Sequence, residues 1–202
     1  RRLTAEGGGR QHGHRSDATA PANRPLGMTG GPGCVLPPTR SRINRVQRSD
    51  TTLRDGTQRE GLSLSASDKV KLAARLDAFG IDTIEGGWPG SNPTDAEFFR
   101  RVQSHPPRRA RIAAFGSTRR VGISCTNDPS LQALVCANTP VVTIVGKSSV
   151  AHVRIVLETT REENLRLIAD TVGYFRALGK DVVYDAEHFF DGLALDEAYA
   201  LE

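Results

Sequence analysis

The amino-acid sequence predicts an α/β protein, a (β/α)8 TIM barrel of which about the first five β/α units are present. Two observations support this fold class. From Asp50 onward, strand-like and helix-like segments alternate roughly every 30 to 40 residues, as in parallel sheets with right-handed crossovers. Each predicted strand also ends in polar residues, and a barrel places all such residues on one rim. A doubly wound open sheet is the alternative, and it would gather them at one switch point.

The individual elements follow from hydrophobic periodicity and from start and stop residues. Ser67 is a plausible N-cap, and Val70, Leu72, Ala73, Leu76 and Phe79 form one apolar face before Gly80 ends the helix. Thr94 or Asp95 is expected to cap the next helix. The predicted helices span residues 67–79, 94–102, 129–137 and 160–178, with another starting at Leu195, and the predicted strands span residues 81–85, 110–116, 141–145 and 181–185.

Residues 1–45 differ in composition from the rest of the chain. They are rich in Gly, Pro, Arg and Ser and show no apolar periodicity, so they cannot bury enough surface to offset the entropy of ordering. We therefore expect a disordered leader over residues 1–45 and a partial TIM-barrel catalytic domain over residues 46–202. Arginines of the leader carry much of the net charge of +4.

Composition excludes several classes of function. Because the part after residue 45 is close to neutral and has no basic stripe interleaved with aromatic residues, we expect no nucleic-acid partner. The longest apolar runs are too short to cross a bilayer, so no membrane association is expected. The 3 cysteines have no C-x-x-C spacing, which argues against a disulfide framework or structural zinc and favours a cytoplasmic location.

Residues 50–61 are the first stretch that carries chemistry. Arg54 and Asp55 place a permanent cation beside a hard oxygen ligand, and Gly56 allows the backbone to turn sharply. Taken alone, such a pair is most simply a surface ion pair in a turn. The later strands end in further candidates, namely Glu85, Lys147, His152, Glu187 and His188.

Three motifs carry a resemblance to a known family. Residues 50–58, 84–93 and 184–192 resemble the citramalate branch of the isopropylmalate and homocitrate synthase family, whose catalytic domain is a (β/α)8 barrel. The resemblance runs from about Asp50 to the end of the sequence. It implies a Claisen condensation of the small molecules acetyl-CoA and pyruvate to citramalate, in isoleucine biosynthesis, by an enzyme expected to be a homodimer in its full-length form.

The resemblance also implies roles for individual residues. Asp55 would be an oxygen ligand of a divalent metal (Mg, Mn or Zn), and Arg54 would bind substrate and stabilise negative charge on the attacked carbonyl. Gln58 would line the 2-oxo acid pocket.

Later residues receive roles in the same way. His152 and Asp185 would contact substrate, and Glu187 would lie near the acetyl group, positioning it or helping to deprotonate it. For His152, an ordinary structural histidine is the alternative. We expect Glu85 and Trp88 to shape the rim without reacting.

The sequence also departs from the family pattern. Charged residues occupy positions 45–49, where an apolar strand is expected, Ser149-Val150 replaces Trp-Asp, and no late His-x-His metal-ligand pair is present. We therefore expect the 202-residue chain alone to be inactive. Alternatives are an isopropylmalate synthase acting on another 2-oxo acid, a biotin-dependent carboxyltransferase, and a non-catalytic partial-barrel scaffold.

Overall fold

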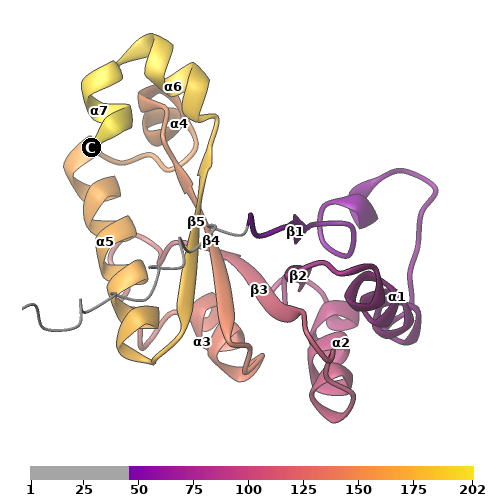
Figure 1. Cartoon of the computed structure of the whole chain (residues 1–202). Coiled ribbons are helices and arrows are strands. Elements are labelled where there is room, and N and C mark those ends of the chain that lie inside the picture. The colour runs from indigo at the N-terminus through magenta and orange to yellow at the C-terminus, as the bar shows by residue number, and fades with distance from the viewer. Residues whose placement is uncertain (1–45) are drawn as a thin grey trace, which may run out of the picture. The chain divides into compact units, whose positions relative to one another are not determined.

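The structure, a computed structural model, describes residues 46–202 (Figure 1). The leader predicted over residues 1–45 lies outside the described residues. The elements, in chain order, are β1 (Ser49–Asp50), η1 (Gly56–Gln58), α1 (Ala66–Phe79), β2 (Thr83–Gly87), α2 (Pro93–Ser104), β3 (Arg111–Ser117), α3 (Pro129–Cys136), β4 (Val141–Lys147), α4 (Val150–Ile155), α5 (Arg161–Ala177), β5 (Asp181–Glu187), α6 (Phe189–Leu195) and α7 (Glu197–Leu201).

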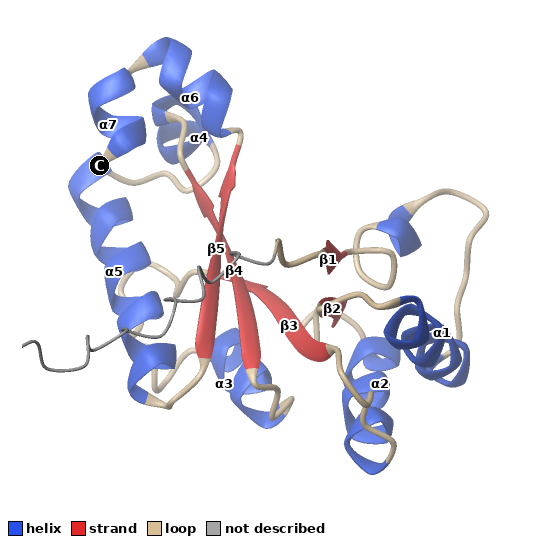
Figure 2. Ribbon diagram, viewed as in Figure 1, coloured by secondary structure: helices blue, strands red, loops and turns tan. Residues whose placement is uncertain are grey.

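The five strands form one parallel sheet in the order β1-β2-β3-β4-β5 (Figure 2). Each strand therefore lies beside the strand that follows it in sequence, and helices run between them. A barrel requires this sequential order, whereas a doubly wound sheet reverses direction from its first strand. The predicted fold class, an incomplete (β/α)8 barrel, is confirmed, and the open-sheet alternative is wrong.

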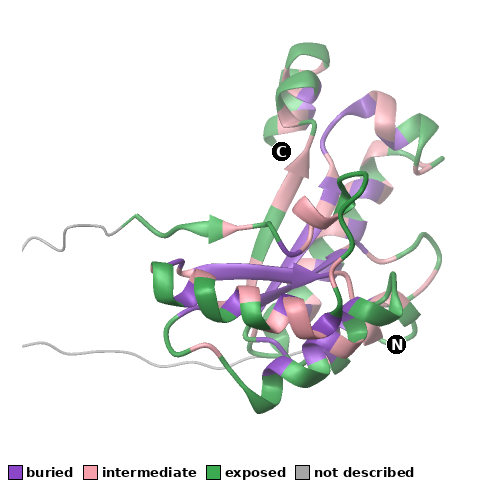
Figure 3. Cartoon of the chain, turned by 90° about the vertical axis from the view of Figure 1, so that its right-hand side faces the viewer, coloured by how far each residue is buried: buried purple, intermediate pink, exposed green. Residues whose placement is uncertain are grey.

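Alternation along the strands divides the sheet into two faces. One face packs against the helices: Ile84 lies opposite Ile112, and Ala114 opposite Val142. These residues are buried with helix residues in one hydrophobic core, which includes Phe98, Phe99, Leu131, Leu134 and Phe175. Figure 3 shows the resulting concentration of buried residues in the central strands.

The other face corresponds to the interior of the barrel. Phe115, Thr143 and Val183 lie side by side on it, and further along, at the carboxyl ends of β4 and β5, it carries Lys147 opposite Glu187. The carboxyl ends of β3, β4 and β5 therefore bring polar side chains together on this face. This is the rim that the sequence predicted.

The two N-caps differ from the predicted ones. Ser65, not Ser67, caps α1, because its extended backbone lets its hydroxyl accept the Asp68 N–H. Asn92 caps α2 by accepting the Asp95 N–H at 2.8 Å, and Pro93 takes the first helical position. Because Asn92 supplies the cap, the Asp95 side chain is not used for capping and instead contacts Lys69 of α1.

Other boundaries of the predicted elements also need correction. Phe79 was assigned to the buried face of the first helix, but it lies at the last turn and is 77% exposed. A helix was predicted to begin at Leu195, but Leu195 is the last residue of α6. The extended backbone of Asp196 ends that helix, and its side chain then caps α7. The six-residue α4 was not predicted, since so short a segment shows no periodicity. No helix within residues 46–202 is long and apolar enough to span a membrane.

A buried carboxylate fixes the start of β3. Asp77, near the end of α1, accepts the backbone N–H groups of Arg108, Arg109 and Ala110 at 2.7 to 2.9 Å. The bond from Ala110 is the largest cause that lowers the pKa of the Asp77 carboxyl, against burial, which raises it. This carboxylate therefore ties α1 to the segment between α2 and β3.

We expect Asp77→Asn to lower the free energy of unfolding by about 2–3 kcal/mol at neutral pH, because the amide offers one acceptor oxygen to three donors. Since the pKa of Asp77 is lowered in the folded state, its contribution is present above the unfolded pKa of about 4 and is lost as the pH falls through the folded value. The difference between wild type and variant should therefore shrink below about pH 4 in urea unfolding curves. Glu60→Gln, in an exposed loop, is the control, and an equal loss in both variants would contradict the prediction.

Candidate active site

Arg54 is held in one orientation after β1. Its Nε and Nη2 atoms both lie 2.9 Å from Oε2 of Glu85, and its guanidinium lies 4.0 Å from the centroid of the Phe115 ring. The side chains of Arg54 and Glu85 are 16% and 7% exposed. Trp88 meets the Phe115 ring edge-on at 5.5 Å, so the aromatic support is itself packed. The guanidinium is therefore preorganised.

The loop that carries Arg54 is a tight backbone turn. The N–H groups of Arg54, Asp55 and Gly56 all donate to the Thr51 carbonyl oxygen at 2.8 to 3.2 Å. The Thr57 hydroxyl donates to the Arg54 carbonyl oxygen at 2.8 Å. Leu53 is fully buried and anchors the loop in the core. The structure thus contains the ion pair in a turn, with Arg54 Nη1 at 3.3 Å from Asp55 Oδ1. The guanidinium, however, lies against Phe115 on the interior face of the barrel.

A pocket of about 330 Å³ opens at this rim. It brings together four of the six predicted site residues: Arg54, Asp55, Gln58 and Glu187. The remaining lining residues come from the ends of β3 and β4 and from nearby loops, namely Trp88, Phe115, Ser117, Thr118, Val145, Gly146, Lys147 and Leu157. The parallel strand order therefore gathers residues that are far apart in sequence, such as Arg54 and Glu187.

Glu187 is paired with Lys147, its register partner on β4. The Lys147 ammonium donates to Oε2 of Glu187, and this bond is the largest cause that lowers the pKa of the Glu187 carboxyl. Glu187 is therefore ionised at neutral pH and is a weaker proton acceptor than an ordinary glutamate.

The other two predicted site residues lie near the pocket without lining it. Asp185 is opposite Val145 and, two residues before Glu187, shares the interior face. His152 lies on α4, where its ring meets that of His188 edge-on at 4.6 Å. The Nδ1 atom of His152 is buried and has no hydrogen-bond partner among the described residues. The structure thus places His152 beside the site and leaves its contact with substrate a prediction.

The predicted metal ligand can be compared with the donors around it. The Asp55 side chain is 63% exposed, and its carboxylate has only the 3.3 Å contact with Arg54 in the described part of the chain. It fits the role of one hard oxygen ligand. Within residues 46–202, however, no three His, Cys, Asp or Glu side chains converge as a metal centre would require.

The sequence analysis did not predict which side chains hold Arg54. Glu85 was predicted to shape the rim, and it does so by fixing the guanidinium directly. Phe115 was treated only as part of an apolar strand, although its ring face supports the same cation. Glu85 could have been found as a carboxylate at the end of a buried strand, whereas nothing in the sequence distinguishes Phe115 from the other apolar residues of its strand.

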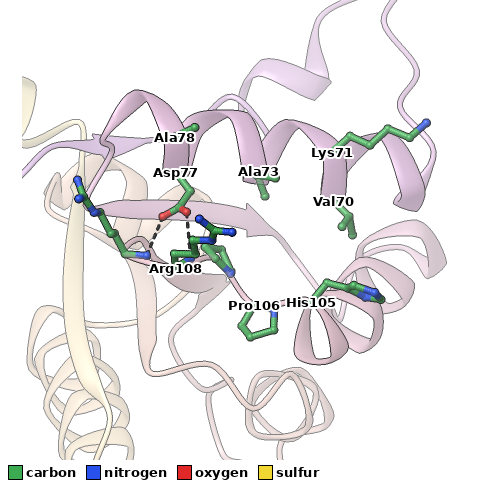
Figure 4. A pocket seen from close by; sticks show the side chains of 11 residues that line it. Val70, Lys71, Ala73, Asp77, Ala78, His105, Pro106 and Arg108 are labelled. Atoms are coloured by element: carbon green, nitrogen blue, oxygen red, sulfur yellow. Dashed lines mark hydrogen bonds between the residues drawn. The ribbon is translucent and has the colours of Figure 1, made fainter.

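A larger cavity, of about 860 Å³, lies elsewhere, between α1 and residues 105–109 (Figure 4). The one carboxylate that lines it, Asp77, already accepts three backbone N–H groups. None of the six predicted site residues lines this cavity, whereas four of them line the rim pocket, so the rim pocket is the better candidate active site.

Comparisons with known proteins agree with the motifs. Residues 45–198 match the family described as HMGL-like. The chain is 53% identical over 152 residues to an (R)-citramalate synthase of Synechocystis sp., covering 75% of this chain and 28% of that protein. It is 50% identical over 158 residues to an (R)-citramalate synthase of Aquifex aeolicus, covering 78% and 30%. A probable 2-isopropylmalate synthase of Methanopyrus kandleri is 34% identical over 159 residues, covering 79% and 30%.

Solved structures show the same fold. A hydroxymethylglutaryl-CoA lyase from Pseudomonas aeruginosa aligns with a TM-score of 0.53 at 21% identity, and the HMG-CoA lyase of Bacillus subtilis aligns with 0.52 at 14% identity. Each alignment covers 69% of this chain and 45% of the other. The chain spans about 30% of the length of the curated relatives named above. The resemblance predicted from the three motifs is confirmed: the chain belongs to the HMGL-like family.

Proposed function

We propose that residues 46–202 supply the 2-oxo acid part of the active site of an acyltransferase that condenses acetyl-CoA with pyruvate to citramalate, in isoleucine biosynthesis. The observation that carries the proposal is the partly buried Arg54 guanidinium, fixed by Glu85 and Phe115 and lining a pocket that also holds Asp55 and Gln58. Relatives named (R)-citramalate synthase are 53% and 50% identical, against 34% for the isopropylmalate synthase.

The chemistry of the residues supports this reaction. A base takes a proton from the acetyl methyl group, the methyl carbon bonds to the keto carbon of pyruvate, and the electron pair of the carbonyl moves onto its oxygen, which takes up a proton to give the hydroxyl of citramalate. Arg54 would stabilise that developing charge, because its orientation is set before the reaction begins. Gln58 would line the pocket for pyruvate. Water then cleaves the thioester, and CoA leaves.

Two other groups complete the proposed site. Glu187, ionised beside Lys147, is better suited to orienting the acetyl group than to accepting its proton, since its pKa is lowered. Asp55 would be one ligand of a divalent metal (Mg, Mn or Zn) that polarises the keto group when bound. We further propose a cytoplasmic homodimer.

The proposal is tested by following CoA release with a thiol reagent. We expect no turnover by the 202-residue chain alone, and turnover by a chimera in which its aligned 152 residues replace their counterpart in the Synechocystis relative. The chimera should prefer pyruvate to 2-oxoisovalerate. The opposite preference would favour an isopropylmalate synthase-type reaction. A folded chimera that is inactive with both acids would favour a non-catalytic scaffold.

A further inference from the structure

Lys147 has a place in the rim pocket that no predicted role explains. It is the last residue of β4, and its carbonyl oxygen accepts Nδ2 of Asn164 at 2.9 Å. Asn164 is 1% exposed, and the same amide nitrogen donates to the Tyr199 hydroxyl at 2.7 Å. The backbone of Lys147 is therefore anchored from α5 and α7, which fixes where its side chain enters the pocket.

The ammonium of Lys147 keeps donors available for a ligand. It bonds to one carboxylate oxygen of Glu187, and an ammonium carries three N–H donors. Its side chain is 22% exposed and lines the same pocket as Arg54. The pocket thus holds two cations, one from the loop after β1 and one from the end of β4, each bound to its own glutamate.

The pocket's charges select the class of anion. Asp55 and Glu187 also line it, so a multiply charged phosphate would meet two carboxylates, whereas a small monocarboxylate adds one negative charge. A 2-oxo acid presents a carboxylate and a keto oxygen on adjacent carbons. These two acceptors match two separate cationic donors.

We propose that Lys147 is a second substrate-binding cation, which receives the carboxylate of the 2-oxo acid while Arg54 receives its keto oxygen. This inference rests on the proposed function for the identity of the acid. In this role Lys147 binds the acid by charge and hydrogen bonding alone, as it already does with the carboxylate of Glu187.

The test compares pyruvate with its methyl ester, which lacks the carboxylate charge, by ligand-observed NMR titration of the 202-residue chain. Wild type should bind pyruvate more tightly than the ester, and Lys147→Met should weaken pyruvate binding about tenfold and remove that preference. Lys147→Arg should retain the preference. Lys71→Met, an exposed lysine of α1, is the matched control.

The Glu187→Gln variant shows whether Lys147 binds the ligand or serves only in a structural ion pair. If Lys147 binds the acid, losing its carboxylate partner should leave pyruvate binding equal or tighter, so the two variants diverge. Equal weakening of pyruvate binding in Glu187→Gln and Lys147→Met would overturn the inference. So would a Lys147→Met variant that still prefers pyruvate to its methyl ester. A wild-type chain that binds neither pyruvate nor 2-oxoisovalerate would also overturn it. Lys147-dependent binding of 2-oxoisovalerate in preference to pyruvate would retain the inference and count against the proposed substrate. Thermal unfolding of each variant checks that it is folded.

Discussion

Lys69→Met is expected to lower the free energy of unfolding by about 3–5 kcal/mol, because it leaves a buried carboxylate without its cation. Lys69 is 1% exposed, and its ammonium donates to Oδ1 of Asp95, which is 8% exposed. The same ammonium lies 5.6 Å from the centroid of the Phe98 ring. Methionine would fill much of the space, so the loss would report the missing charge more than a cavity. Urea unfolding at neutral pH measures the effect.

The matched control is Lys71→Met on the same helix. The Lys71 side chain is 74% exposed and lies 3.5 Å from Asp68, and an exposed pair of this kind contributes at most about 1 kcal/mol. Adding Asp95→Asn to Lys69→Met should recover part of the lost stability, since the amide removes the unpaired charge. A Lys69→Met variant within about 1 kcal/mol of wild type would show that Asp95 is stabilised by other groups.

This buried pair also supports the candidate site. Oδ2 of Asp95 accepts the Trp88 N–H at 2.8 Å, and Trp88 packs against Phe115 beneath Arg54. Gly87, just before Trp88, has a φ of 140°, and a Cβ there would lie 2.4 Å from the Asp95 carboxylate. The close approach of β2 to α2 therefore depends on both the ion pair and the glycine.

The sequence predicted the parts of this structure that local pattern and strand order determine. The alternation of strands and helices predicted a sequential parallel sheet. In a barrel the strand ends share one rim, so the sequence also predicted that Arg54 and Glu187 meet there although they are far apart in the chain. Sequence patterns did not predict features that depend on tertiary contacts. Lys69 resembles any exposed helix lysine in sequence, yet it is buried because Asp95 lies opposite.

Dependence on tertiary contacts also explains which features of the site the sequence did not predict. Phe115 belongs to an apolar strand, and alternation alone does not reveal that its ring would support a guanidinium. His152 and Asp185 were predicted from motifs, but their distance from the pocket depends on the short α4 and on side-chain direction in β5. Such details require the packed structure.

Arg54→Lys is expected to lower kcat of the chimera with pyruvate about 10²–10³-fold, the loss typical of removing an oriented donor from a developing oxyanion. Lysine keeps a positive charge near Glu85, so the variant should remain folded. It loses the planar arrangement in which Nε and Nη2 meet Glu85 and Nη1 meets Asp55. Its ammonium would therefore not be held where the keto oxygen gains charge.

Arg59→Lys provides the control, because Arg59 is an exposed residue that follows η1 in the same loop and is not among the residues lining the pocket. Its kcat should stay within about twofold of the unmodified chimera, since surface changes away from such contacts have small effects. An Arg54→Lys variant with nearly unchanged kcat would mean that charge alone suffices and that orientation by Glu85 and Phe115 contributes little. A large loss in kcat with an unchanged melting temperature would instead assign the effect to that orientation, because the fold would be intact while the donor was misplaced.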